Sequence, residues 1–255
     1  MTRVPAPHPF GILVALALLL PAACNSNENE AGASTELTVF AAASLTDAFE
    51  ELGRVLEAES PGLAVTFNFL SSSELAAQIE QGAPADVFAS ADETNMEVIE
   101  RAGLLQDAPR TFARNLLQIA VPPGNPGDVR EPADLEDPEL VVTLCAEECP
   151  AGRYTAEVFE KGGLEVDPDS READVRAVLT RVETAEADAG IVYRTDVAAA
   201  GDAVEGIDIP EDLNVVATYP IATLVDAPGA ADDFIDVVMS ERGQRVLLDY
   251  GFLGA

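Results

Sequence analysis

The sequence has no tryptophan, only one histidine and only one lysine in 255 residues. The histidine is His8, near the N-terminus, and it lies in a segment that we predict to be removed. A Ser-His-Asp hydrolase is therefore excluded. The lysine, Lys161, follows a helical pattern beside two glycines and is a poor candidate for a Schiff base or a general base. Nothing in these scarce residue types favours an enzyme.

Basic residues are also few: 14 lysines and arginines stand against 46 acids, which gives a formal net charge of −32. So acidic a surface repels nucleic acid, and we expect no nucleic-acid partner. Paired carboxylates could hydrolyse sugars, but a chain with 46 acids offers such pairs by chance, and it has no tryptophan to stack on a sugar ring. A secreted hydrolase is therefore only a weak alternative, and we expect that the protein is not an enzyme.

Long apolar runs are missing except near the N-terminus. The run over residues 11–20 is too short to span a bilayer comfortably, and small residues follow it at 21–23. This pattern predicts a secretory signal over residues 1–23. Cys24 comes next, as in lipoprotein processing, so we favour a lipid anchor on Cys24. The alternative is simple cleavage that leaves a free cysteine.

Only three cysteines are present. If Cys24 is acylated, Cys145 and Cys149 remain as a candidate disulfide pair, which export permits. A metal site is the competing idea, but no histidine or further cysteine is available to complete one. Residues 24–36 are rich in Asn, Glu, Ser, Ala and Gly, and we predict that they form a flexible tether.

Two serine-bearing corners follow two predicted strands. Residues 63–69 alternate apolar and polar side chains, which predicts a strand, and residues 74–81 repeat apolar side chains at helical spacing. Between them, Ser71 and Glu74 match a capping box, with Ser72 in the middle of a serine triplet. Residues 37–41 form a second β-prone run, and Ser44 follows it at a corresponding corner before another helical pattern. The carboxyl ends of parallel strands lie side by side, so both corners point to one ligand site.

Unpaired amides and the positive end of the helix dipole lie at such corners, so the sequence predicts an anion site made without cations. The plain structural alternative is that both serines only cap helices. Asp86 and Asp92 flank a predicted buried strand that follows the Ser72 corner in the sequence. We interpret both as structural, since carboxylates beside an anion would oppose binding.

These motifs resemble the molybdate-binding (ModA-type) proteins of bacterial ABC importers. The resemblance runs in order from about residue 37 to residue 254. It is carried by VFAAASLTDA at residues 39–48, SSSELA at 71–76, GAPADVF at 82–88 and GIVY at 190–193.

The resemblance implies an α/β, two-lobe fold of the periplasmic-binding-protein type (type II). Each lobe would be a mostly parallel sheet flanked by helices, which also agrees with the regular strand–helix alternation. Lobe 1 would comprise residues 37–111 and 221–255, and lobe 2 residues 112–220. The ligand would lie in the cleft between them, and the lobes would close on it by a hinge motion.

The resemblance also implies the site. Ser44 and Ser72 match the two serines whose hydroxyls hold the oxyanion, and Tyr193 matches the tyrosine. Ala151 and Val175 match positions that donate backbone amides at helix starts. The alternatives are that Val175 is only a core residue and that Tyr193 packs at a strand end with its hydroxyl in water. No cation ligand and no cofactor are expected.

The predicted function is therefore high-affinity binding of molybdate or tungstate outside the cytoplasm. Delivery to the permease and ATPase of an ABC importer is implied by the resemblance alone. We expect an exported monomer, anchored by lipid on the outer face of the cytoplasmic membrane or free in the periplasm. The alternative is a binding protein for another tetrahedral oxyanion, such as sulfate or phosphate. The sequence does not separate molybdate from tungstate.

Overall fold

The computed structural model describes residues 35–255. They belong to one compact unit, Ser34–Ala255. The predicted signal over 1–23, Cys24 and all but the last two residues of the tether lie outside the described residues. Among the residues described, no helix has the length and apolar character needed to cross a bilayer.

Strands and helices alternate along the described chain and fall into two groups, which we call lobe 1 and lobe 2. Lobe 1 contains β1 (Thr35–Ala42), η1 (Ala43–Leu45), α1 (Thr46–Glu59), β2 (Leu63–Leu70), α2 (Ser72–Glu80), β3 (Val87–Ala89), α3 (Glu93–Arg101), α7 (Ala230–Met239) and α8 (Glu241–Asp249). Lobe 2 contains η2 (Pro132–Glu136), β5 (Val142–Cys145), α4 (Pro150–Gly162), β6 (Ser170–Glu172), α5 (Val175–Glu183), β7 (Ala189–Tyr193), α6 (Arg194–Ala200), η3 (Gly201–Ala203) and β8 (Glu205–Asp208). Two further strands, β4 (Arg110–Val121) and β9 (Val216–Thr223), connect the lobes.

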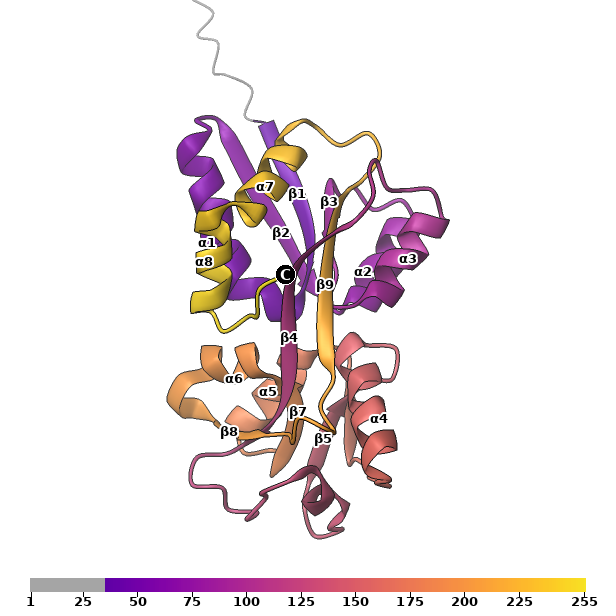
Figure 1. The fold of residues 1–255 in the computed structure, drawn as a ribbon, viewed down its shortest axis with the longest axis vertical. Helices are drawn as coiled ribbons and strands as arrows, with labels where there is room; N and C mark the ends of the chain where they lie inside the picture. The colour runs from indigo at the N-terminus through magenta and orange to yellow at the C-terminus, as the bar shows by residue number, and fades with distance from the viewer. Residues whose placement is uncertain (1–34) are drawn as a thin grey trace, which may run out of the picture. The chain divides into compact units, whose positions relative to one another are not determined.

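One continuous sheet carries both lobes, with strand order β2-β1-β3-β9-β4-β7-β5-β6 and with β8 paired to β4. Strand β1 is parallel to β2 and β3, and β5 is parallel to β6 and β7. Every pair that involves β4 or β9 is antiparallel. Figure 1 shows these two strands side by side between the helices of lobe 1 and those of lobe 2. The sheet is therefore parallel within each lobe, as expected, and antiparallel at the two crossing strands. The exact lobe boundaries stay a prediction.

The core of lobe 1 explains why α1 forms where it does. Ala48, Phe49 and Leu52 recur at helical spacing, and all three are buried on the face that packs toward the sheet. Phe49 meets Phe234 of α7 edge-on, with ring centroids 5.4 Å apart. Burial of such side chains contributes on the order of 2 kcal/mol each to folding.

Several predicted element boundaries were wrong. The capping box is absent: no side chain caps α2, and the Ser71 hydroxyl instead bonds to that of Ser73 at 2.8 Å. This bond between Ser71 and Ser73 occupies the hydroxyl that would cap the helix, so it competes with the cap. Helix α2 also begins at Ser72 rather than at Glu74. Strand β1 includes Thr35 and Glu36, so the predicted tether over residues 24–36 extends two residues too far.

Candidate functional site

All five residues predicted to bind an oxyanion line the same small pocket. Its volume is about 10 Å³, close to the space that one water molecule requires. Five residues line it beside the predicted set: Ala42, Ala43, Ala91, Cys149 and Pro150. The pocket therefore combines residues of lobe 1 with residues of lobe 2, and no charged side chain lines it.

Parallel pairing of β1 with β2 brings the two serines together. Ala42 and Leu70, at the ends of these strands, are paired in register. Ser44 follows Ala42 within η1, and Ser72 follows Leu70 as the first residue of α2. Both serines are buried, with 4% and 0% of their surface exposed. The predicted corners therefore lie side by side at the carboxyl ends of adjacent strands.

Neither serine hydroxyl caps a helix, so the plain structural alternative does not hold. The Ala91 amide donates a hydrogen bond to Ser72 Oγ at 2.9 Å. Because this oxygen accepts, the hydroxyl proton of Ser72 can be donated to a ligand. Ser44 Oγ lies 2.9 Å from the hydroxyl of Tyr219, a buried residue of β9.

Lobe 2 contributes the starts of two helices. Ala151 is the second residue of α4 and Val175 the first of α5. Asp174 caps α5 by accepting from the amides of Arg176 and Ala177, which leaves the Val175 amide out of the cap. Among the described residues, neither the Ala151 amide nor the Val175 amide donates to another backbone or side-chain oxygen. Such amides at a helix start, reinforced by the helix dipole, favour an anion.

A disulfide lies directly before α4. It joins Cys145 to Cys149, whose Cα atoms are 6.1 Å apart. Close packing adds to this link, because a Cβ on Gly152 would lie only 2.0 Å from the carbonyl oxygen of Ala146. The chain before α4 is therefore held tightly against the first turn that carries Ala151.

Tyr193 is the most informative residue of the pocket. It ends β7 with 1% of its surface exposed, and its buried hydroxyl has no hydrogen-bond partner among the described residues. Its ring meets that of Tyr219 edge-on, with centroids 5.8 Å apart. Burial, together with the nearby tyrosines and carboxylates, raises the pKa of Tyr193 well above its ordinary value. The phenol therefore stays protonated and can donate to a ligand.

Charged side chains lie next to the pocket rather than in its lining, and they are paired. Arg153 of α4 bonds to Asp92, which caps α3 through the Asn95 amide at 3.0 Å. Asp86 accepts from the Thr38 amide at 2.7 Å. Both predicted structural carboxylates thus make structural contacts.

The second arginine, Arg176, contacts two carboxylates. It bonds to Asp47 of α1, and its Nε lies 3.0 Å from Asp196. Burial by itself would lower the pKa of Arg176, but Asp196 and Asp47 outweigh burial and raise it. Burial raises the pKa of Asp196 to about 6, against the opposing effects of Arg176 and of the Tyr193 amide.

The sequence reasoning missed Tyr219, Asn115 and the partners of Arg176. Asn115 donates to Thr195 at 2.9 Å and to the Tyr219 hydroxyl at 3.4 Å, so it supports the group that contacts Ser44. These contacts could not be predicted from sequence spacing, because the two partners of Asn115 lie 80 and 104 positions away from it.

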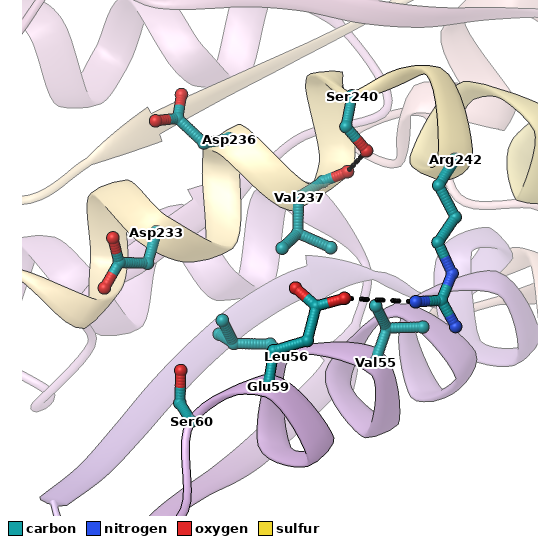
Figure 2. Close-up of a pocket in the computed structure, with 9 residues that line it drawn as sticks. All are labelled: Val55, Leu56, Glu59, Ser60, Asp233, Asp236, Val237, Ser240 and Arg242. Carbon is teal, nitrogen blue, oxygen red and sulfur yellow. Dashed lines mark hydrogen bonds and ion pairs between the residues drawn. The ribbon is translucent and has the colours of Figure 1, made fainter.

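A larger hollow of about 550 Å³ lies between α1 and the α7–α8 pair (Figure 2). Glu59, Asp233 and Asp236 line it, and Arg242 pairs with Glu59 at 3.1 Å. Three carboxylates against one paired arginine suit this hollow poorly to an anion. Of the two, the smaller pocket, which has no charged side chain in its lining, is therefore the better candidate for the predicted anion site.

Comparisons with known proteins identify relatives of this chain in sequence and in fold. The family model of the bacterial extracellular solute-binding proteins matches residues 37–253. The molybdate-binding protein ModA of Mycobacterium tuberculosis H37Rv is 40% identical over 250 residues, which cover 95% of this chain and 96% of that protein. Two solved structures share the fold. The periplasmic molybdate-binding protein of Azotobacter vinelandii has a TM-score of 0.75 at 20% identity and covers 86% of this chain and 99% of its own. The sulfate-binding protein SubI of Mycobacterium tuberculosis has a TM-score of 0.76 at 18% identity and covers 87% of each chain.

Proposed function

Since this chain belongs to the bacterial extracellular solute-binding proteins, we propose that it binds molybdate or tungstate and delivers the oxyanion to an ABC importer. The family binds solutes, and relatives that match nearly the whole chain are named molybdate-binding proteins. The two-lobe α/β fold that the sequence predicts is the fold of these relatives.

One observation carries the proposal: the pocket is lined by neutral donors and contains a buried donor without a partner. Ser44, Ser72 and Tyr193 supply hydroxyls, and Ala151 and Val175 supply amides. The orphaned hydroxyl of Tyr193 costs free energy in the absence of an acceptor, about 1–3 kcal/mol. A bound oxyanion supplies that acceptor, so ligand binding removes the cost.

The donor set also indicates which oxyanions fit. A fully deprotonated tetrahedral dianion accepts hydrogen bonds and donates none, which matches a pocket that only donates. Hydrogen phosphate carries an O–H group, which would face donors without finding an acceptor. We therefore expect phosphate to be rejected by unpaired polar groups rather than by its size.

The surroundings of the site agree with a protein that acts outside the cytoplasm. We propose that the signal over 1–23 is removed and that Cys24 carries a lipid, which keeps the binding domain near a permease and its ATPase. The Cys145–Cys149 disulfide suits an oxidising compartment. We propose that the protein acts as a monomer, with residues 37–111 and 221–255 as lobe 1 and 112–220 as lobe 2.

The test is a calorimetric titration of one protein sample with molybdate, tungstate, sulfate and phosphate in turn. We expect tight binding of molybdate and tungstate and weak binding of phosphate. Sulfate is also a dianion without a proton at neutral pH, and its binding measures how far the size of the pocket adds selectivity. Phosphate bound as tightly as molybdate, or no heat from molybdate, would contradict the proposal.

A further inference from the structure

Two arginines of lobe 2 each bridge to a carboxylate of lobe 1 beside the pocket. Arg153 bonds to Asp92, and Arg176 bonds to Asp47. Their positions repeat the same plan. Each arginine lies in the first turn of a helix, within two residues of a proposed amide donor. Each carboxylate lies within three residues of a residue that lines the pocket from lobe 1, Ala91 in one case and Ser44 in the other.

These two bridges are among the less exposed ion pairs of the described chain. The side chains of Arg153 and Asp92 are 30% and 4% exposed, and those of Arg176 and Asp47 are 28% and 42% exposed. The side chains of Arg130 and Asp128, which pair within one loop, are 75% and 77% exposed. Water and salt screen the bridges less than they screen such a surface pair, so each bridge has a larger effect.

Each bridge is also held in place by its own lobe. Asp92 accepts from the Asn95 amide and from the Asn95 side chain, at 3.0 and 2.9 Å. Arg153 donates to the carbonyl of Glu148 at 2.6 Å, and Arg176 lies against Asp196. Contacts within their own lobes thus orient Asp92, Arg153 and Arg176, so these three side chains lose little freedom when a bridge forms.

The bridges join parts of the fold that the sheet keeps apart. Asp92 and Asp47 start helices that follow β3 and β1, whereas Arg153 and Arg176 start helices next to β5 and β7. Strands β9 and β4 separate β3 from β7 in the sheet. A bridge across the pocket therefore exists only while the two lobes are apposed.

We propose that Arg153–Asp92 and Arg176–Asp47 form a two-point clasp that holds the lobes closed over the bound oxyanion and sets its rate of release. This inference rests on the proposed oxyanion-binding function. The arginines act as positioning residues: their guanidinium groups are occupied by carboxylates, so they hold the donor-bearing helices α4 and α5 against lobe 1 and leave the neutral donors to contact the anion. Loss of a partner from such a charge pair mainly raises the dissociation rate.

The experiment uses the full chain and molybdate. Association is followed by stopped-flow tyrosine fluorescence, since Tyr193 lies in the pocket and the sequence has no tryptophan. Calorimetry gives Kd, and the product of Kd and the association rate gives the dissociation rate. The variants are R153Q and R176Q. The matched controls are R101Q and R130Q, which remove one positive charge from an ion pair within one helix or one loop.

We expect R153Q and R176Q each to raise the dissociation rate about tenfold, with an association rate close to that of the controls. Added salt speeds release from the unsubstituted protein but has little effect in the R153Q/R176Q double variant. The conservative R153K variant, which keeps the charge, recovers part of the loss. A purely structural role would produce neither the salt effect nor the recovery.

Dissociation at the rate of the controls would overturn the clasp while leaving the proposed function intact. Tighter binding by D92N would also overturn it, because it would mean that a released Arg153 contacts the anion directly. Failure of the unsubstituted protein to bind molybdate would overturn the proposed function itself, and the two failures are thus distinguishable.

Discussion

Replacement of Tyr193 by phenylalanine separates binding from folding, because the two are expected to change in opposite directions. The Tyr193 hydroxyl is buried without a partner in the described structure. An unsatisfied buried polar group costs about 1–3 kcal/mol. Y193F removes that group and keeps the ring and its edge-on contact with Tyr219. The ligand-free variant should therefore be at least as stable as the unsubstituted protein.

Binding should weaken at the same time. A hydrogen bond to a charged acceptor contributes about 1.5–3 kcal/mol. Its loss corresponds to an increase of about 10- to 150-fold in the Kd for molybdate, at about 1.4 kcal/mol per factor of ten. Part of this loss of affinity comes from the ligand-free protein. Y193F removes the unsatisfied hydroxyl, so binding no longer gains free energy by satisfying it.

The assay combines calorimetric titration with molybdate and thermal unfolding of the ligand-free protein. Y250F is the matched control, because Tyr250 donates its hydroxyl to Glu51 at 3.0 Å and does not line the pocket. Y250F should leave the Kd unchanged. An unchanged Kd in Y193F, or a ligand-free Y193F that unfolds several degrees earlier, would refute the assignment of Tyr193 as a donor.

Three further predictions follow from the same contacts. S44A and S72A should each weaken molybdate binding by about 1–3 kcal/mol in a calorimetric titration, since each loses one donor to a charged acceptor. The C145S/C149S double variant should lose about 2 kcal/mol of unfolding free energy, measured in denaturant, because the disulfide closes a short loop. Asp196 has a pKa of about 6 in the folded protein, against an ordinary value of 3.8, so the folded state binds the extra proton between these values. Its contribution to the free energy of unfolding should therefore fall by up to about 3 kcal/mol as the pH rises from about 4 to about 6. D196N should lack this fall when both proteins are unfolded thermally across that range.

Each of these tests has a control in the same chain. S73A removes a neighbouring hydroxyl that bonds only to Ser71, so it should bind molybdate normally. Reductant should destabilise the unsubstituted protein but not the double serine variant. D202N, at an exposed position, should keep the pH dependence of the unsubstituted protein. The first prediction fails if S44A and S72A bind molybdate as tightly as S73A does. The second fails if reductant destabilises the double serine variant as much as the unsubstituted protein. The third fails if the stability of D196N changes with pH in parallel with that of the unsubstituted protein.

The parts of the fold that could be predicted from the sequence depend on local patterns. Alternating apolar residues predicted β2, and apolar residues at helical spacing predicted α1 and α2. The two serine corners follow from these elements, because parallel strands bring their carboxyl ends together. The sequence therefore placed Ser44 beside Ser72 by physical argument.

The remaining contacts of the site depend on positions that are distant in the sequence. The bridge from Arg153 to Asp92 spans 61 positions, and that from Arg176 to Asp47 spans 129. In a chain with 46 acids, no spacing distinguishes the carboxylates that form these pairs from the rest. Ala151 and Val175 act through backbone amides, which leave no trace in residue type, so only the family resemblance pointed to them.

The capping box shows the opposite error, in which a local pattern predicted too much. Ser71 and Glu74 have the right spacing, but the Ser71 hydroxyl bonds to Ser73 instead. The hydroxyl next to it, on Ser72, accepts from the Ala91 amide, 19 positions away. A tertiary contact thus decides which serine of the triplet points into the pocket.

Crystals grown with molybdate give the most direct test of the central claim, because molybdenum can be located by its anomalous scattering. We predict one molybdenum peak in the pocket, with oxyanion oxygens within about 2.7–3.2 Å of the Ser44, Ser72 and Tyr193 hydroxyls and of the Ala151 and Val175 amides. A peak elsewhere, or an anion held by Arg153 or Arg176 in place of the neutral donors, would contradict the account.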